Sequence, residues 1–340
     1  MKTLSDICEV YSGYALKEFN DQNEGLPVIK IGNIMTDGTL TLEDCQYTSE
    51  VVNEKYYSKK GDIYVALSGA TTGKIGILES EERHVINQRV GVVRRKNYDV
   101  PQQFVKYFLM RQTDRILQEA SGCAQPNISP KQIAQYEVPK LSKTEMEEIS
   151  NILDKLSYVI TQRKDELQKL DELIKARFVE MFGDVILNDK NWQCKAWADV
   201  LTIVNGRNQK DVEAENGEYL ICGSGGPMSR ATNYLTNENS VIIGRKGNIN
   251  KPILMREKFW NVDTAFGLEP DTMQIMVEYL YLYCVLFDFE KLNKAVTIPS
   301  LTKTDLLKIE MPIPNFALQK KFAEFCAQVD KSKVVALKAA

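Results

Sequence analysis

Residues able to do covalent chemistry are sparse in this chain of 340 residues. His84 is its single histidine, so a catalytic triad or a histidine-rich metal site lacks its usual components. The seven cysteines stand singly, without a C-x-x-C pair, at positions 8, 45, 123, 194, 222, 284 and 326. An odd number of isolated cysteines is typical of reduced thiols in a cytosol, and not of a disulfide framework or a zinc cluster. We therefore expect no catalytic residue and no metal site.

Two glycine-bearing segments resemble nucleotide-binding loops but fail their requirements. "SGATTGKIG" at 68–76 has Ser68 where a phosphate-binding loop needs its first glycine, and Ile75 where that loop needs a hydroxyl for magnesium. "GSGGP" at 223–227 does not match the dinucleotide pattern G-x-G-x-x-G. The sequence thus predicts no cofactor.

Charge and hydropathy argue against two classes of protein, a basic DNA-binding protein and a membrane protein. Lys and Arg total 43 against 46 Asp and Glu, a net charge of −3, so the chain is not a basic protein of the kind that binds DNA non-specifically. The longest apolar run, 276–287, contains Glu278 and is shorter than the ~18–20 residues that cross a bilayer. A membrane protein is not expected.

The chain contains an internal repeat. "PNISPKQIAQYEVP" at 126–139 aligns without a gap to "PSLTKTDLLKIEMP" at 299–312, 173 residues later. Upstream, Gly13 pairs with Gly206, and "VIKIG" pairs with "YLICG". Each copy mixes short apolar or alternating runs with turns, and we expect a helix over 102–119 in the first copy and near 273–288 in the second. The repeat therefore predicts two duplicated α+β domains.

A different pattern follows each copy. Residues 142–182 contain neither Pro nor Gly, Ser142 and Glu145 have the spacing of a capping box, and Gly183 is a helix stop. Apolar residues alternate 4 and 3 apart, which predicts a coiled-coil helix roughly 60 Å long. A second, shorter helix is expected from Asn315, antiparallel to the first. The expected seam comprises Ile149, Leu153, Leu156, Ile160, Leu167, Leu170 and Ile174, with Leu153, Leu156 and Ile160 facing Phe322, Cys326 or Val329.

In both copies an apolar strand leads into a polar loop that contains glycine. The loops are Leu67–Lys74 and Gly244–Asn250. Glycine lets a backbone approach a phosphate or base closely, and Arg, Lys, Asn and Thr are side chains that hold phosphates or read bases. A solvated hairpin turn is the alternative interpretation of the same residues.

These segments together resemble a known family. The motifs are "LSDICEVYSG", "GDIYVALSGATTGKIGIL", "NSVIIGRKGN", "QPNISPKQIAQYEVPKLSKTEMEEISNIL" and "KLDELIKARFVEMFGD". They are similar to the specificity subunit of type I restriction–modification enzymes across essentially the whole chain. The second helix is shorter than the first, about 26 residues from 315 to 340.

The resemblance implies target-recognition domains at 1–141 and 185–314, and spacer helices at 142–184 and 315–340. It implies a cytoplasmic, non-catalytic subunit that reads a split site in double-stranded DNA and docks two modification (methyltransferase) subunits and a restriction subunit. The DNA contacts expected are Tyr14, Lys17, Ser68, Thr71, Thr72, Lys74, Gln88, Arg89, Arg207, Lys210, Ser224, Arg245, Lys246 and Asn248. One alternative is a coiled-coil scaffold with paired protein-binding domains. Another is the recognition module of a fused restriction–methylation enzyme, which would need catalytic motifs that this sequence lacks.

Overall fold

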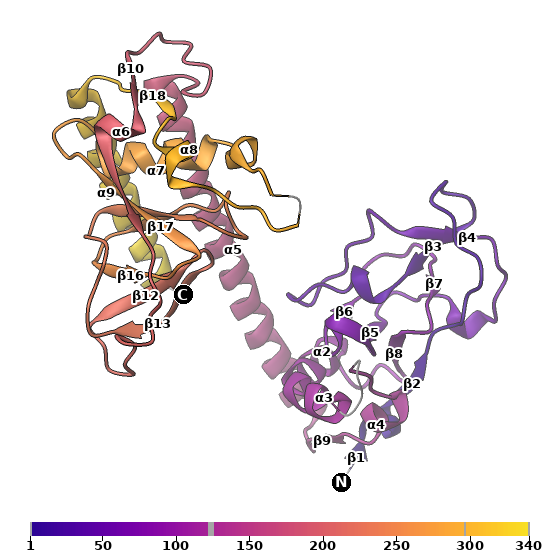
Figure 1. Cartoon of the computed structure of the whole chain (residues 1–340). Helices are drawn as coiled ribbons and strands as arrows, with labels where there is room; N and C mark the ends of the chain where they lie inside the picture. Colours follow the sequence, from indigo (N-terminus) through magenta and orange to yellow (C-terminus); the bar gives the residue numbers. More distant parts are fainter. Residues whose placement is uncertain (1, 122–125, 296, 339–340) are drawn as a thin grey trace. The chain divides into compact units, whose positions relative to one another are not determined.

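The computed structural model describes residues 2–121, 126–295 and 297–338 (Figure 1). Cys123 lies outside these residues. The chain divides into two compact units, Met1–Val159 and Ile160–Ala340. Each unit combines short strands with helices, so the predicted α+β class is confirmed.

The first unit is built from strands with short helical segments between them. Its strands are β1 (Lys2–Thr3), β2 (Cys8–Ser12), β3 (Leu26–Ile29), β4 (Gln46–Thr48), β5 (Ile63–Ala66), β6 (Ile75–Ile77), β7 (Val85–Ile86), β8 (Val90–Arg95) and β9 (Glu137–Val138). Its helical segments before the long helix are α1 (Leu4–Ile7), η1 (Ile31–Asn33), η2 (Glu54–Tyr56), η3 (Gly69–Thr71), α2 (Gln102–Arg111), α3 (Thr113–Ala120) and α4 (Pro130–Ala134).

The second unit repeats this layout. Its strands are β10 (Cys194–Ala196), β11 (Leu201–Asn205), β12 (Tyr219–Gly223), β13 (Gly226–Ala231), β14 (Ser240–Gly244), β15 (Ile253–Met255), β16 (Phe259–Asn261), β17 (Ala265–Pro270) and β18 (Glu310–Pro312). Its helical segments are α6 (Trp197–Val200), α7 (Val277–Leu286), η4 (Phe289–Leu292), α8 (Lys303–Leu306) and α9 (Phe316–Lys338).

The sheets confirm the duplication. The four-stranded sheet has the order β2-β8-β5-β6 in the first unit and β11-β17-β14-β15 in the second, antiparallel throughout. A three-stranded sheet accompanies each, β4-β3-β7 and β13-β12-β16, with one antiparallel and one parallel pairing in both. A two-stranded ribbon, β1-β9 or β10-β18, completes each set. Corresponding strands follow the same sequence order, as expected for two copies of one fold.

Burial explains which residues form the central strands. Strands β5 and β14 are buried along their whole length and are rich in β-branched residues, which suit a pleated surface covered on both faces. In the first unit Asp62, just before β5, pairs with Arg94 of β8, their Oδ2 and Nη2 atoms 2.6 Å apart. The Asp62 side chain is 2% exposed and also accepts a hydrogen bond from Arg94 Nε. This two-point ion pair joins the two strands.

The helix expected over 102–119 is two helices, and that prediction is corrected. Helix α2 ends at Arg111 and α3 begins at Thr113. The Gln112 amide donates to Leu109 O, three residues back, and the Thr113 hydroxyl donates to Met110 O. These local hydrogen bonds accompany the break between the two helices. Nothing in the sequence indicated it, since no Pro or Gly lies at this point.

The long helix predicted after the first copy is present as α5 (Lys143–Phe182). The Ser142 amide donates to Glu145 Oε2 and the Glu145 amide donates to Ser142 Oγ, the reciprocal bonds of a capping box. At the other end Gly183 has φ +76° and donates its amide to Val179 O, which closes the helix. The start and stop signals in the sequence are confirmed.

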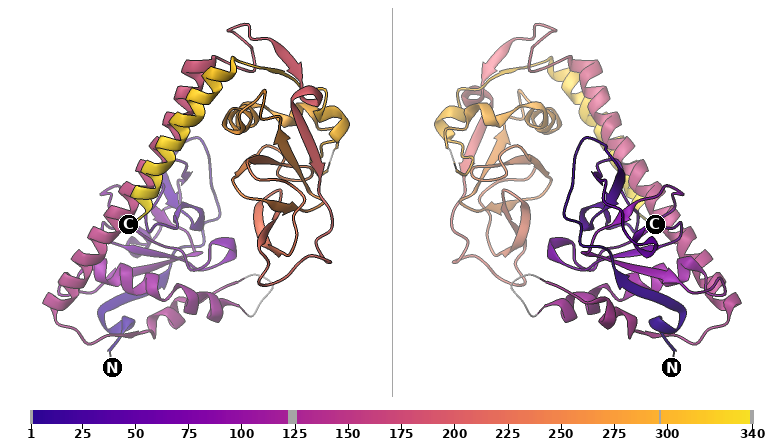
Figure 2. Two further views of the ribbon diagram at one scale, coloured as in Figure 1. Left: turned by 90° about the vertical axis from the view of Figure 1, so that its left-hand side faces the viewer. Right: turned by 90° about the vertical axis from the view of Figure 1, so that its right-hand side faces the viewer.

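Helix α9 packs antiparallel against the second half of α5 (Figure 2). The Phe322 ring lies 5.4 Å from both Phe178 and Phe182, whereas Lys333, eleven residues later, pairs with Asp171 at 2.7 Å. The antiparallel direction is as predicted, but the predicted register is wrong. The predicted register paired residues 173 apart, which are equivalent positions of the two helices. In an antiparallel pair, however, the start of α9 lies beside the end of α5, so Phe322 contacts Phe178 and Phe182.

The seam residues accordingly divide into two groups. Leu167, Leu170 and Ile174 are half-buried in the part of α5 beside α9, where Ile174 packs on a core that contains Phe322 and Cys326. In the first half of the helix Ile149, Leu156 and Ile160 are exposed by 38%, 52% and 48%. Leu153 is half-buried there, while Val329 of α9 is buried.

Candidate nucleic-acid interface

In the first unit three chain segments meet at one edge of the four-stranded sheet. Strands β2 and β5 end at this edge, and β8 and β6 begin there, because β8 runs antiparallel to β2 and β5. We call it the loop edge; it carries residues 67–74, 87–89 and the segment after Ser12. Tyr14 joins this set by donating its amide to Ile86 O, and Leu67 does so by donating its amide to Arg89 O. The second unit has the same edge, at the ends of β11 and β14 and the starts of β17 and β15.

The same main-chain bonds hold the main loop of each unit. In the first unit Leu67 N donates to Arg89 O (3.0 Å), Gly69 N to Pro126 O (3.1 Å) and Ile128 N to Leu67 O (2.9 Å). In the second unit the corresponding bonds are Arg245 N to Thr264 O (2.8 Å), Gly247 N to Pro299 O (3.0 Å) and Leu301 N to Arg245 O (2.9 Å). We call each set of three hydrogen bonds the loop clasp.

Glycine is required within both clasps. Gly69 has φ +81° and Gly247 has φ +79°, a backbone conformation that side chains with a Cβ rarely adopt. The side chains that follow these glycines differ between the units, with Ala70 and Thr71 in one and Asn248 and Ile249 in the other. The two loops therefore share a backbone design and present different chemistry.

The expected site residues of the first unit fall into accessible and structural groups. Gln88 and Arg89 are exposed at the loop edge, and Ser68 and Lys74 are half-buried on the main loop. The half-buried Tyr14 packs against Tyr56 in a tilted arrangement, with ring centres 5.3 Å apart. These five side chains therefore lie at the loop edge of the first unit.

Three other expected residues have different surroundings. Thr72 is 6% exposed and its hydroxyl donates to Gly69 O, a hydrogen bond within the loop. Thr71 is half-buried, and its hydroxyl makes no hydrogen bond with any described residue. Lys17 is exposed, and its amide donates to Glu50 Oε1, which follows β4.

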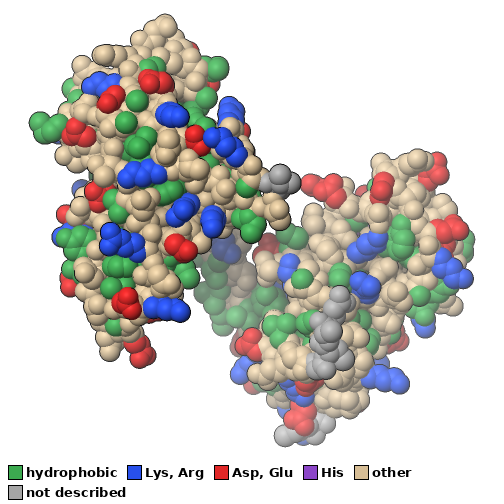
Figure 3. All heavy atoms as spheres, viewed as in Figure 1, with side chains coloured by type: hydrophobic (Ala, Val, Ile, Leu, Met, Phe, Trp, Pro, Cys, Tyr) green, Lys and Arg blue, Asp and Glu red, His purple; other side chains and the backbone are tan. Residues whose placement is uncertain are grey.

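In the second unit Arg245, Lys246 and Asn248 lie on the main loop. Lys246 and Asn248 are exposed, while the half-buried Arg245 guanidinium lies 5.7 Å from the centre of the Phe266 ring, within cation–π range. The turn at Ser224 is close by, because a Cβ added to its neighbour Gly225 would lie 3.8 Å from Asn248 Nδ2. Figure 3 shows basic side chains scattered over the visible face of this unit, with no continuous basic patch.

Arg207 and Lys210 lie on the segment that follows β11. The Arg207 amide donates to Asn261 O, and Arg207 O accepts from Trp260 Nε1 at 3.1 Å, which brings this residue to the loop edge. Lys210 is exposed farther along the same segment. Asn261 is fully buried and donates its Nδ2 to Val204 O and Ala265 O, so it joins β11 to the start of β17 at this edge.

Sequence reasoning missed the segments that complete the two clasps. Asn127 forms an isolated antiparallel β-bridge with Ser68, and Ser300 forms one with Lys246. Asn127 and Ser300 therefore lie beside the tips of the main loops. The signal was available, since Asn127 and Ser300 occupy the same place in the repeated motif at 126–139 and 299–312. That motif indicated a duplication but not which loop it would hold.

The lone histidine and four of the described cysteines (Cys8, Cys222, Cys284 and Cys326) are buried, whereas Cys45 is half-buried and Cys194 is exposed. His84 is 1% exposed, and burial lowers its pKa below the ordinary value. Burial also raises the pKa of the thiols of Cys8, Cys222 and Cys326 to about 12, which disfavours the reactive thiolate. Within residues 2–121, 126–295 and 297–338, no three His, Cys, Asp or Glu side chains form a group able to hold a metal. No helix in those ranges is long and apolar enough to cross a bilayer.

Comparison with known proteins identifies the family. A family model described as the type I restriction modification DNA specificity domain matches residues 1–172 and 189–338. The chain belongs to this family. The specificity subunit of the type I restriction enzyme EcoBI from Escherichia coli is 22% identical over 175 residues, which are 51% of this chain and 35% of that protein. The matched segment thus spans about a third of that relative.

Solved structures agree with this family at the level of the fold. The S subunit of a type I restriction–modification system from M. genitalium superposes with a TM-score of 0.62 at 16% identity, over 99% of this chain and 91% of that one. A chain from a study of complex assembly and conformational transition of the type I system gives a TM-score of 0.51 at 15% identity, over 99% and 91%. At such identities the agreement concerns the fold.

Proposed function

We propose that this chain is the non-catalytic DNA-recognition subunit of a type I restriction–modification system. It reads a split site in double-stranded DNA, one half with the segment 1–141 and the other with the segment 185–314. The helical segments 142–184 and 315–340 act as the spacer. It works in the cytoplasm and needs no cofactor, since the methyl-transfer and cleavage chemistry resides in two methyltransferase subunits and a restriction subunit.

One observation carries this proposal: the loop clasp occurs twice with different side chains on it. A duplicated backbone that presents Ser68 and Lys74 in one copy and Arg245, Lys246 and Asn248 in the other is suited to two different base sequences. The near-neutral net charge of −3 agrees with a subunit whose partners supply much of the phosphate contact. The family match and a structural neighbour described in terms of complex assembly support those partners.

Selection from randomised duplexes tests the proposal. The chain, mixed with the methyltransferase of its own system, should enrich DNA with two short specified sequences separated by an unspecified gap. The methyltransferase alone, with no specificity chain, is the control. A coiled-coil scaffold would enrich no sequence, and that result would refute DNA recognition.

A further inference from the structure

A hollow lined largely by basic residues lies at the end of the first four-stranded sheet that is opposite the loop edge. Strand β5 begins at this end and β8 ends there. The hollow has a volume of about 220 Å³, and two short segments, 59–62 and 94–98, line it. Five of its nine lining residues are basic and only Asp62 is acidic; the basic ones are Lys59, Lys60, Arg94, Arg95 and Lys96. We call it the basic hollow.

Two of the five cations have a carboxylate partner. Arg94 Nη2 lies 2.6 Å from Asp62 Oδ2, and the Asp62 side chain is 2% exposed, so the acidic lining residue is already occupied. Lys60 Nζ lies 2.9 Å from Glu81 Oε1, in a pair whose side chains are both exposed. Arg94 is therefore neutralised, and Lys60 only weakly, because solvent screens an exposed pair.

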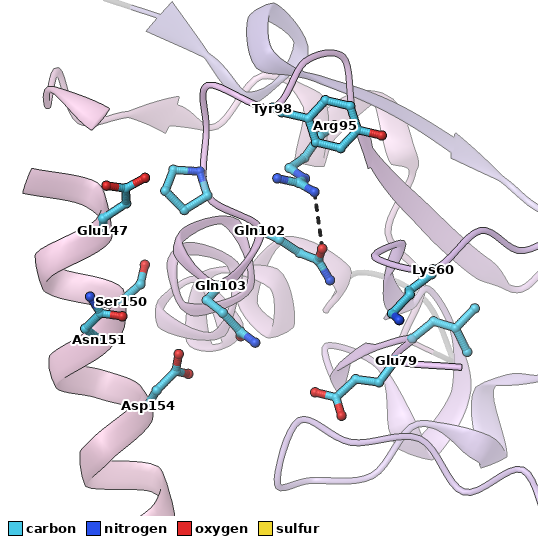
Figure 4. Close-up of a pocket in the computed structure, with 12 residues that line it drawn as sticks. Lys60, Glu79, Arg95, Tyr98, Gln102, Gln103, Glu147, Ser150, Asn151 and Asp154 are labelled. Carbon is cyan, nitrogen blue, oxygen red and sulfur yellow. Dashed lines mark hydrogen bonds between the residues drawn. The ribbon is translucent and has the colours of Figure 1, made fainter. Parts of the chain in front are cut away.

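The other three cations have no counter-charge. Lys59, Arg95 and Lys96 form no ion pair with any described residue. Arg95 donates to two neutral oxygens, Val100 O at 3.0 Å and Gln102 Oε1 at 3.3 Å (Figure 4). The Lys96 ammonium donates to a main-chain carbonyl, and the Lys59 ammonium makes no hydrogen bond with the part of the chain that the structure describes. Most N–H donors of these three side chains therefore remain available.

Carboxylates outside the lining leave this positive charge in place. Asp6, Glu9 and Asp99 are close in the fold, but they are exposed, and none of them pairs with a lining cation. The larger hollow drawn in Figure 4 shares residues with the basic hollow, among them Arg95 and Tyr98, and its carboxylates lie on α5 and after β6. The lining of the basic hollow itself therefore keeps an excess of positive charge.

The second unit carries the opposite charge at the same place. Strand pairing makes β5 equivalent to β14 and β8 equivalent to β17, which fixes the positions that correspond to the charged lining residues. Those positions hold three acids and no base: Asn237, Glu238, Ser240, Glu269, Pro270 and Asp271. The same backbone thus forms without the cations, so the fold itself does not require Lys59, Arg95 and Lys96.

The lining has the chemistry of a phosphate site. Arg, Lys, Asn and Tyr are side chains that hold phosphates, and all four types occur here, with Asn97 and Tyr98 beside the cations. A terminal phosphate, or two successive phosphates of a nucleic-acid strand, brings about two negative charges, whereas a single carboxylate brings one. The volume is below the ~300–1,000 Å³ of pockets that enclose a drug-sized ligand. The basic hollow therefore fits the charged group of a ligand and not a whole small molecule.

We propose that the basic hollow binds a phosphate group, either of the DNA backbone or of free phosphate. The chemistry recognised is the same for both sources. The site is separate from base recognition at the loop edge, because the four residues of β5 place the two ends of the sheet about 13 Å apart. It occurs once per chain, since the second unit lacks the cations. The inference thus goes beyond the proposed function and does not depend on it.

Inorganic phosphate is the first probe. Isothermal titration calorimetry at low salt should show one phosphate site per chain. Lys59→Asn with Lys96→Asp, which introduces the residues of the second unit, should weaken this binding about tenfold or more, the factor for a lost hydrogen bond to a charged group. The matched control is Lys140→Asn with Lys155→Asp, which makes the same charge change at two exposed lysines of the same unit outside the hollow.

Two further variants separate binding from folding. Lys59→Gln removes an exposed ammonium that makes no bond in the fold, so it should weaken phosphate binding without lowering the thermal unfolding temperature. Lys59→Arg keeps the positive charge and should retain phosphate binding. These two results test the site even if the double variant unfolds.

A random-sequence duplex, followed by fluorescence anisotropy, distinguishes the two sources of phosphate. If DNA supplies the phosphate, the variant Lys59→Asn, Lys96→Asp should bind the duplex more weakly than the control does, and inorganic phosphate should compete with the duplex. If free phosphate is the ligand, the variant and the control should bind the duplex equally and differ in calorimetry alone.

The proposal is overturned if neither probe distinguishes the variant from the control. It is also overturned if polyglutamate binds the wild type and not the variant while neither phosphate probe does so, because the basic hollow would then receive carboxylates of a partner protein. Selection of a split DNA site tests the proposed function through other residues, so that test succeeds or fails independently of this one.

Discussion

Neutralising the two basic residues of the second loop should change how DNA binding depends on salt. Arg245 is half-buried against Phe266, and Lys246 is exposed at the tip of the loop. The loop clasp fixes their backbone through Arg245 N and Arg245 O, which do not depend on either side chain. The double variant Arg245→Gln, Lys246→Gln should therefore keep the loop in place and remove two positive charges from it.

The magnitude follows from counterion release. Each phosphate contact contributes about 0.9 to the slope of log affinity against log salt, so two contacts contribute about 1.8. Between 50 and 200 mM salt, a fourfold change, the wild type should lose roughly twelvefold more affinity than the variant, as that difference in slope requires. At low salt the variant should bind more weakly, and the difference should shrink as salt rises.

Fluorescence anisotropy with a labelled duplex, at saturating methyltransferase, measures both slopes. The matched control is Lys308→Gln, Lys320→Gln, two exposed lysines of the same unit that lie outside the loop edge. Slopes that agree between variant, control and wild type would refute the phosphate contacts. An unchanged slope with an altered base preference would show that the loop reads base edges instead.

Three further predictions concern the helices and the thiols. Phe322→Ala should destabilise the second unit by about 3–5 kcal/mol in denaturant unfolding, because the ring is fully buried between Phe178 and Phe182. The control is Phe316→Ala, whose ring is 38% exposed. A loss of stability no larger than that of the control would contradict this packing. Four residues inserted after Arg163, adding about 6 Å of helix, should lengthen the unread gap in the selected DNA site without changing the bases on either side, and altered bases would exclude a spacer role. At pH 8 a thiol reagent should label the exposed Cys194 quickly and the buried Cys326 only on unfolding. The reason is that a pKa of about 12 leaves roughly one thiolate in ten thousand at Cys326. Labelling is measured by mass spectrometry, and equal rates at the two cysteines would contradict the burial of Cys326.

The sequence predicted the parts of the fold that repeat or that depend on local signals. The gapless alignment of 126–139 with 299–312 predicted two like domains, and the sheets have the same strand order in both. Ser142, Glu145 and Gly183 marked the ends of α5 because capping depends on neighbouring residues only. The contacts between α5 and α9 could not be predicted in the same way. The repeat shows which residues of the two helices are equivalent, whereas packing decides which residues are in contact.

The candidate site shows a similar division. Residue type and loop position were enough to nominate Arg245, Lys246 and Asn248, which lie together in the structure. They were not enough for Thr72, whose hydroxyl bonds to Gly69 O inside the loop, because a small polar residue in a turn can serve the backbone as well as a ligand.

The loop clasps have a practical consequence for changing what this protein binds. Main-chain atoms make all three bonds of each clasp, so the side chains at Ser68, Lys246 and Asn248 are open to wholesale randomisation. Gly69, Gly247 and Thr72 must stay, because two supply a left-handed backbone and the third a hydroxyl bond. Since both units build the same clasp, a tip selected in one is a candidate for transplantation into the other. The duplicated scaffold is thus a starting point for recombining binding preferences one half at a time.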